Sequence, residues 1–102
     1  MTEPALPYER IALADDLHLT WDRHLVTVAT ERWEPGVFVY DIEYLTVEVK
    51  PRRGATGVTL RSRGVNFHFR VLRFDLDETT FHRFEGFIGR VRAHRDRLRE
   101  HS

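Results

Sequence analysis

The chain has 102 residues, 41% of them hydrophobic and 31% charged, with a formal net charge of zero and no cysteine. This length predicts a single domain over residues 1–102, which removes roughly 60–68% of its unfolded surface from water and folds without staples. The lack of cysteine excludes disulfides, Cys-ligated zinc and a thiol nucleophile. No apolar run approaches the roughly 20 residues that span a bilayer, and no signal-peptide pattern is present, so we expect a cytoplasmic protein.

Alternating apolar and polar residues, which are typical of half-buried β-strands, dominate the chain from residue 17 to residue 74. Segments 17–21 and 24–33 predict a hairpin with a short connection at Asp22-Arg23. Residues 8–14 are a candidate for one more strand before this hairpin.

The middle of the chain is punctuated by turn residues. Pro35-Gly36 indicates a turn, and strands are expected next at 37–40 and 42–49. Pro51 is expected to end the second of these strands, because proline cannot donate a hydrogen bond to a ladder. Residues 50–57, made of proline, glycine and charged side chains, are predicted to form the one long loop.

The last strands are predicted as a hairpin around Gly64, formed by segments 57–64 and 65–74. Strands therefore occupy about residues 8–74. The second segment alternates, and these apolar residues are expected to share one face: Val65, Phe67, Phe69 and Val71.

After residue 74 the apolar period changes to three or four residues, which predicts an amphipathic helix over about residues 78–100. Asp77 or Thr79 is expected to cap its first turn. Gly86 and Gly89 each cost a helix about 1 kcal/mol relative to alanine, so we expect them to let the backbone approach the sheet closely. The predicted buried stripe is Phe81, Phe84, Phe87, Ile88, Val91 and Leu98.

Charge is balanced in sum but divided along the chain. Residues 1–49 carry ten acidic and three basic side chains, net −7, whereas residues 50–102 carry six acidic and thirteen basic ones, net +7. This pattern predicts either attraction between the two halves, within a chain or between copies, or an anionic partner for one half. The interpretation we favour is that acidic and basic strands lie side by side and neutralise each other across the sheet.

No residue pattern predicts an enzyme, a metal site or a cofactor. Phosphate-loop, dinucleotide-binding, zinc-protease and nucleophile motifs are absent. Asp75 and Asp77 form a carboxylate pair, but such a pair before a helix is more typical of an N-cap. A metal site would need His18, His68 and His82 to meet by folding, and solvated or hydrogen-bonded histidines are the more common outcome. Four aromatic residues could form a platform on which a base or another ring stacks, but at strand positions we expect them in the core or on a sheet face: Trp21, Trp33, Tyr40 and Tyr44.

The passage VFVYDIEYLTVEV, from Val37 to Val49, resembles the strands that enter the middle of the sheet in pleckstrin-homology-like (PH-like) domains of small bacterial type, including the YcxB-like group. The passages GVTLRSRGVNFHFRV and FHRFEGFIGRV are similar to the last hairpin and the closing helix of those domains. The likeness covers about residues 17–92. It implies a mainly β fold, a bent antiparallel sheet or barrel of six or seven strands capped by one C-terminal amphipathic helix.

The sequence departs from PH domains at two places. PH domains that bind phosphoinositides carry several basic residues around the first hairpin, whereas residues 21–24 here hold one arginine beside an acid. The helix carries phenylalanines on the face where those domains most often have tryptophan. The resemblance therefore implies a binding module without implying phosphoinositide recognition at this turn.

These observations predict a non-enzymatic PH-like binding or scaffold module that acts through protein–protein contact or self-association, using strand edges and its charge-divided surface. The alternative is an anion-binding module for acidic lipid headgroups, as on an acidic membrane surface, or for nucleic-acid phosphates. Its basic patch lies within residues 50–73, which contain no acidic residue. The candidate binding residues are Lys50, Arg52, Arg53, Arg61, Arg63 and Arg70.

Overall fold

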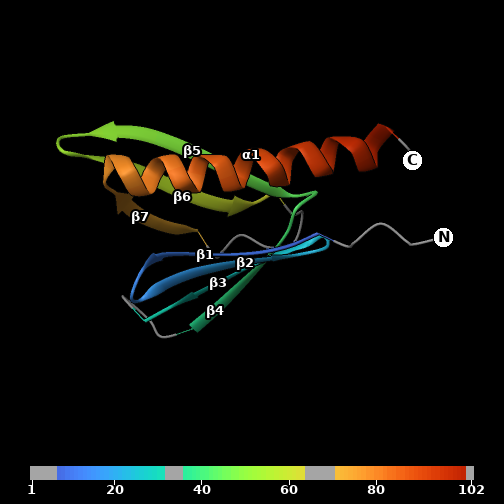
Figure 1. The fold of residues 1–102 in the computed structure, drawn as a ribbon, viewed down its shortest axis with the longest axis horizontal. Helices are drawn as coiled ribbons and strands as arrows, with labels where there is room; N and C mark the ends of the chain where they lie inside the picture. Colours follow the sequence, from blue (N-terminus) through green and yellow to red (C-terminus); the bar gives the residue numbers. More distant parts are fainter. Residues whose placement is uncertain (1–6, 32–35, 64–70, 101–102) are drawn as a thin grey trace.

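The computed structural model describes residues 7–31, 36–63 and 71–100. These residues form a mainly β structure with one C-terminal helix, in which the strands make two antiparallel sheets and the helix runs along them (Figure 1). The elements are β1 (Tyr8–Ala14), β2 (Leu17–Asp22), β3 (Leu25–Thr30), β4 (Gly36–Asp41), β5 (Leu45–Arg52), β6 (Ala55–Ser62), β7 (Leu72–Leu76) and α1 (Glu78–Glu100).

The first sheet is a meander with strand order β1-β2-β3-β4. It confirms the candidate strand at 8–14 and the hairpin of β2 and β3, in which Asp22 pairs with Leu25 around a two-residue turn. Arg23 in this turn has φ 58°, the left-handed conformation that tight hairpins require. The predicted turn at Pro35-Gly36 falls partly outside the described residues, and Gly36 itself begins β4.

The second sheet has strand order β5-β6-β7 and corrects two predictions. Pro51 does not end a strand, because it lies within β5 opposite Thr56. The predicted loop at 50–57 is instead a tight hairpin, whose turn contains Gly54 in a left-handed conformation with φ 73°. Among the described strands β5 pairs only with β6, and proline is tolerated on such an edge strand where its nitrogen faces away from the ladder.

The strand β7 also corrects the predicted apolar face. Leu72, Phe74 and Leu76 are buried, whereas Val71 is exposed. The inward face therefore consists of even-numbered residues at this end of the segment. The turn predicted at Gly64 and the residues expected to share a face with Val71 (65, 67 and 69) lie outside the described residues.

The helix α1 confirms the predicted span of 78–100. Its buried residues are Phe84, Phe87, Ile88 and Val91, and Phe81 is partly buried. Leu98 is wrongly placed in the predicted stripe, since 47% of it is exposed. The last turns of α1 extend past the strands of the second sheet (Figure 1).

The packing role predicted for the helix glycines is wrong. A Cβ built on Gly89 meets no heavy atom within 4 Å, and one built on Gly86 meets only the Nη1 atom of Arg90, from the same helix, at 3.3 Å. Neither glycine therefore brings the helix backbone close to a sheet. Their cost in helix propensity, about 1 kcal/mol each, is not offset by packing.

The core is one cluster drawn from both sheets and the helix. Phe74 of β7 and Phe84 of α1 meet edge to face, with ring centroids 5.9 Å apart, and Trp21 of β2 meets Phe87 in the same way at 6.4 Å. The helix thereby joins the two sheets. Within the described part of the chain, no helix is long and apolar enough to span a membrane.

The N-terminus of α1 is capped by Asp77, one of the two residues that the sequence offers for this role. Its Oδ1 atom accepts a hydrogen bond of 2.7 Å from the backbone N–H of Thr80, and this bond lowers the pKa of Asp77 below its ordinary value of 3.8. A carboxylate whose pKa is lowered by folding stabilises the fold above its unfolded pKa, and this contribution is lost as pH falls through the folded pKa.

We expect Asp77→Ala to lower the urea midpoint of unfolding at neutral pH, with a difference from the parent that shrinks as the pH falls below about 4. Asp77→Asn is the matched control, because asparagine also caps a helix but does not titrate. Unfolding curves of the three proteins across this pH range test the expectation. A pH-independent difference between the parent and Asp77→Ala would contradict it.

Candidate functional site

A shallow groove of about 420 Å³ lies on the outer face of the second sheet, and we call it the basic groove. Strand alternation creates it, because Val58, Leu60, Leu72 and Phe74 face the core and leave their polar neighbours facing outward. The polar or small residues that line it are Glu48, Lys50 and Arg52 of β5, Gly57, Thr59 and Arg61 of β6, and Arg73 and Asp75 of β7.

The predicted binding residues are distributed unevenly around this groove. Three of them, Lys50, Arg52 and Arg61, line it. Arg53 and Arg63 do not line the groove. Arg53 is in the β5–β6 turn, and Arg63 is exposed just after β6. Arg70 lies outside the described residues.

The predicted binding set omitted Arg73, although this residue lines the groove. Its place follows from β7, where Arg73 and Asp75 flank the buried Phe74 and so share the outward face. This alternation is visible in the sequence. The pairing of β7 with β6, which puts Arg73 opposite Thr59, is not.

Two of the four cations of the basic groove are held by carboxylates. Arg52 lies 3.5 Å from Asp75, and Arg61 lies 3.6 Å from Glu48, measured from Nε to Oδ1 and from Nε to Oε1. All four side chains are about half exposed, and exposed pairs of this kind contribute roughly 0–1 kcal/mol to stability. Lys50 and Arg73 have no acidic partner among the described residues. The groove thus carries four positive and two negative charges.

Gly57 makes room for the first of these ion pairs. A Cβ at this position would lie 2.7 Å from Nε of Arg52 and 3.3 Å from Oδ1 of Asp75. The side chain of Arg52 therefore crosses the central strand β6 directly over the glycine to reach Asp75 on β7. Lys50 pairs with Gly57 in the ladder, and Gly57 pairs with Asp75, so these three residues lie in one row across the sheet.

A second hollow, of about 370 Å³, lies at the end of the first sheet, and we call it the acidic hollow. Its charged residues are Asp15 and Asp16 of the β1–β2 turn and Glu31 after β3. His18 also lines it, with Nε2 at 3.0 Å from the backbone oxygen of Asp15. Val37 of β4 also lines it, and Val37 and Val39 are 56% and 57% exposed.

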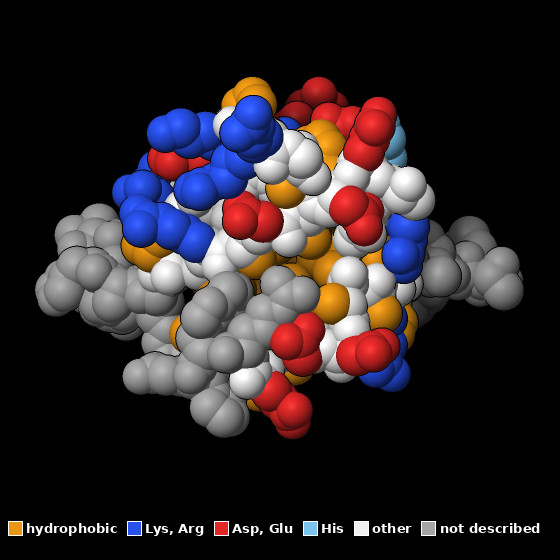
Figure 2. Space-filling view, turned by 90° about the vertical axis from the view of Figure 1, so that its left-hand side faces the viewer, with side chains coloured by type: hydrophobic (Ala, Val, Ile, Leu, Met, Phe, Trp, Pro, Cys, Tyr) orange, Lys and Arg blue, Asp and Glu red, His pale blue; other side chains and the backbone are white. Residues whose placement is uncertain are grey.

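The turns next to the basic groove and the acidic hollow lie at the same end of the molecule. The β5–β6 turn and the β1–β2 turn both lie at the left-hand end of Figure 1. Viewed from that end, Lys and Arg side chains gather at the upper left, and Asp and Glu side chains are spread over the top, the right and the lower part of the face (Figure 2). This end of the protein therefore displays positive and negative charge side by side.

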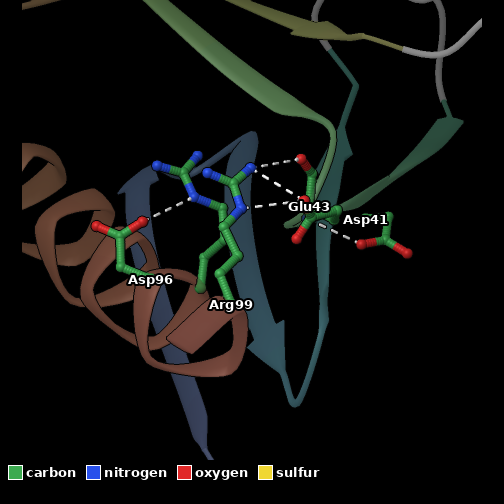
Figure 3. Close-up of polar contacts among 5 residues, drawn as sticks. Asp41, Glu43, Asp96 and Arg99 are labelled. Carbon is green, nitrogen blue, oxygen red and sulfur yellow. Dashed lines mark hydrogen bonds and ion pairs between the residues drawn. The ribbon is translucent and has the colours of Figure 1, made fainter. Parts of the chain in front are cut away.

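The divided charge of the chain is partly neutralised within the fold, but mainly through the helix. Arg90 of α1 donates from Nε and Nη2 to the carboxylate of Glu9 on β1 at 2.7–3.1 Å, which raises the pKa of Arg90 above its ordinary value. Arg99 of α1 donates from Nε to Oε1 of Glu43 at 3.0 Å (Figure 3). Only the pair of Arg61 and Glu48 joins the acidic and basic halves across neighbouring strands of a sheet among the described residues.

The other candidates for chemistry do not assemble in the described part of the chain, where no group of three His, Asp or Glu side chains could hold a metal. His82 is on α1, 3.9 Å from Glu78 and from Glu85, and His18 is on β2. His68 lies outside the described residues.

The aromatic residues do not form a platform in the described part of the chain. Trp21 and Tyr40 are buried in the core, as expected for strand positions, whereas Tyr44 is exposed. Trp33 lies outside the described residues. Comparison of the chain with family models, with curated proteins and with solved structures finds no match.

Proposed function

We propose that this protein is a non-enzymatic, PH-like binding module of the cytoplasm that acts through protein contact, and that its partner is a second copy of itself. The observation that carries the proposal is the presence of two oppositely charged hollows, one on each sheet, beside turns that lie at the same end of the molecule. The basic groove of one copy fits the acidic hollow of the next by charge. The two sheets followed by a C-terminal helix support the PH-like assignment.

The apolar surface beside the acidic hollow adds to this contact. Val37 and Val39 project from β4, an edge strand of the first sheet as described. Edge strands and exposed apolar side chains are common elements of protein interfaces. Two copies related by a twofold axis can each place the basic groove on the acidic hollow of the other, which gives a closed dimer, and a one-sided contact gives a ring or an open chain of copies.

The proposal predicts a salt-sensitive molar mass. Light scattering at low salt should give a mass above the 12.1 kDa of one chain, and the mass should fall as salt shortens the Debye length from about 8 Å at physiological ionic strength to about 3 Å at 1 M. Lys50→Glu in the basic groove, combined with Arg53→Glu in the adjoining β5–β6 turn, should give a monomer at low salt. Arg92→Glu with Arg97→Glu, on exposed positions of α1, changes the charge equally and should still associate.

A mixing experiment identifies the two surfaces. Asp15→Lys with Glu31→Lys reverses the acidic hollow and should also give a monomer. Mixed with the Lys50→Glu, Arg53→Glu protein, it should form a one-to-one complex, because one intact groove then meets one intact hollow. A parent protein that is monomeric at low salt would refute self-association, and two monomeric variants that fail to combine would refute these surfaces.

The second candidate function is anion binding by the basic groove. The observation that favours it is the gathering of Lys50, Arg52, Arg61 and Arg73 on one concave face. Binding of acidic vesicles or polynucleotide at low salt by the monomer, lost in the Lys50→Glu, Arg53→Glu protein, would support it over self-association.

A further inference from the structure

Two of the four cations of the basic groove are paired with carboxylates and two are not. Asp75 and Glu48 hold Arg52 and Arg61, whereas Lys50 and Arg73 have no acidic partner among the described residues. Lys50 comes from β5 and Arg73 from β7, so the two unpaired cations face the groove from opposite sides of the central strand β6.

The central strand β6 carries only small residues between these two cations. Lys50 pairs with Gly57, and Arg73 pairs with Thr59, so the residues of β6 that separate them are a glycine and a threonine. The glycine is covered by the side chain of Arg52 on its way to Asp75, whereas the threonine contributes a hydroxyl that can donate one hydrogen bond. The floor of the groove between Lys50 and Arg73 therefore offers a hydroxyl donor at Thr59.

We infer that the basic groove is a binding site for a phosphate monoester, held between Lys50 and Arg73 over Thr59. This inference rests on the second candidate function. The four cations and two carboxylates of the groove leave a net charge of +2. A phosphate monoester carries about −1.5 to −2 charges at pH 7 and presents three acceptor oxygens, which match the three donor groups.

The same features argue against the other anions. A phosphodiester, as in nucleic acids, has a single negative charge and would leave half of the groove's excess charge uncompensated. A carboxylate offers two coplanar oxygens, which suit one arginine fork but not donors on three strands. The charge and the donor geometry together therefore select the monoester.

The test uses glycerol 3-phosphate as the monoester and dimethyl phosphate as the diester, with amide chemical shifts as the readout. Glycerol 3-phosphate should shift the amides of Gly57 and Thr59 in a saturable way, and dimethyl phosphate should not. Binding should weaken as the pH falls below about 6, where the monoester loses its second charge. Equal shifts from the diester would refute the charge match.

Matched variants locate the site. Lys50→Gln with Arg73→Gln should weaken glycerol 3-phosphate binding by about tenfold or more, the loss expected for charge-assisted hydrogen bonds. Arg92→Gln with Arg97→Gln removes the same charge from α1 and should leave binding unchanged. Equal weakening in both pairs, or shifts spread over the helix arginines, would overturn the proposed site.

Vesicles distinguish the source of the phosphate and separate the site from the general function. Phosphatidylcholine vesicles with phosphatidic acid present the same monoester as a headgroup. If they bind the protein and free glycerol 3-phosphate competes, the ligand is a lipid headgroup, and if only the free ester binds, it is a soluble phosphate ester. If Lys50→Gln with Arg73→Gln still binds vesicles or polynucleotide, the proposed phosphate site is refuted but anion binding stands. If the parent protein binds none of the phosphate esters, vesicles or polynucleotides, both the site and anion binding are refuted.

Discussion

Phe84→Ala is expected to lower the free energy of unfolding by about 3–5 kcal/mol, the range for truncating a buried phenylalanine. Phe84 is 1% exposed and lies at the centre of the contact between α1 and the second sheet. Its ring packs edge to face on Phe74 at 5.9 Å and against Phe81 at 6.5 Å. Since small domains have only about 5–15 kcal/mol of stability, this variant should be close to unfolded in mild urea.

Leu98→Ala on the same helix is the matched control. Its side chain is 47% exposed, so its truncation should change stability by about 0.5 kcal/mol or less. Urea unfolding followed by far-ultraviolet circular dichroism measures both variants. Similar small losses for the two would contradict the docking of α1 on the sheets.

The helix was the most predictable element, because its evidence is local. The apolar period of three or four residues, with a candidate capping aspartate just before it, predicts a helix over about residues 78–100, and α1 spans Glu78–Glu100. Leu98 fits the same period but is exposed, because period alone does not say how far the sheets extend beneath a helix. The prediction for Gly86 and Gly89 failed for a related reason, because a close approach between helix and sheet depends on the sheet as well as on the helix.

The hairpin at 50–57 shows where local signals mislead. Proline, glycine and charged residues are common in loops, yet here they form the paired ends of β5 and β6. Pro51 is compatible with a strand because β5 lies at an edge of the described sheet, and Gly54 supplies a two-residue turn. Edge and centre are decided by strand order, which the sequence of one strand does not contain.

The candidate site was half predictable. The absence of acids in residues 50–73 singled out Lys50, Arg52 and Arg61, and the fold places these three residues on one face. The carboxylates that divide this face, Glu48 and Asp75, come from outside that stretch and reach it through strand pairing. Which cations remain unpaired therefore depends on the register of three strands and could not be predicted from charge counts.

Trp21 links the first sheet to the other half of the helix. It is buried at the end of β2, where its ring meets Phe87 edge to face at 6.4 Å and His94 at 5.7 Å. Its Nε1–H donates to the backbone oxygen of Arg23 at 2.8 Å. This bond fixes the β2–β3 turn, in which Arg23 adopts its left-handed conformation.

We therefore expect Trp21→Ala to lower the free energy of unfolding by about 3–5 kcal/mol, because it removes a buried aromatic ring that joins β2 to α1. Trp21→Phe keeps most of the ring and loses the N–H donor, so it should cost less, with about 0.5–1.5 kcal/mol of its loss due to the hydrogen bond. Urea unfolding of both variants, followed by the far-ultraviolet helix signal, separates the two contributions. If Trp21→Phe lowered the free energy of unfolding as much as Trp21→Ala, the contribution of Trp21 would come from its hydrogen bond to the β2–β3 turn and not from the packing of its ring on the helix.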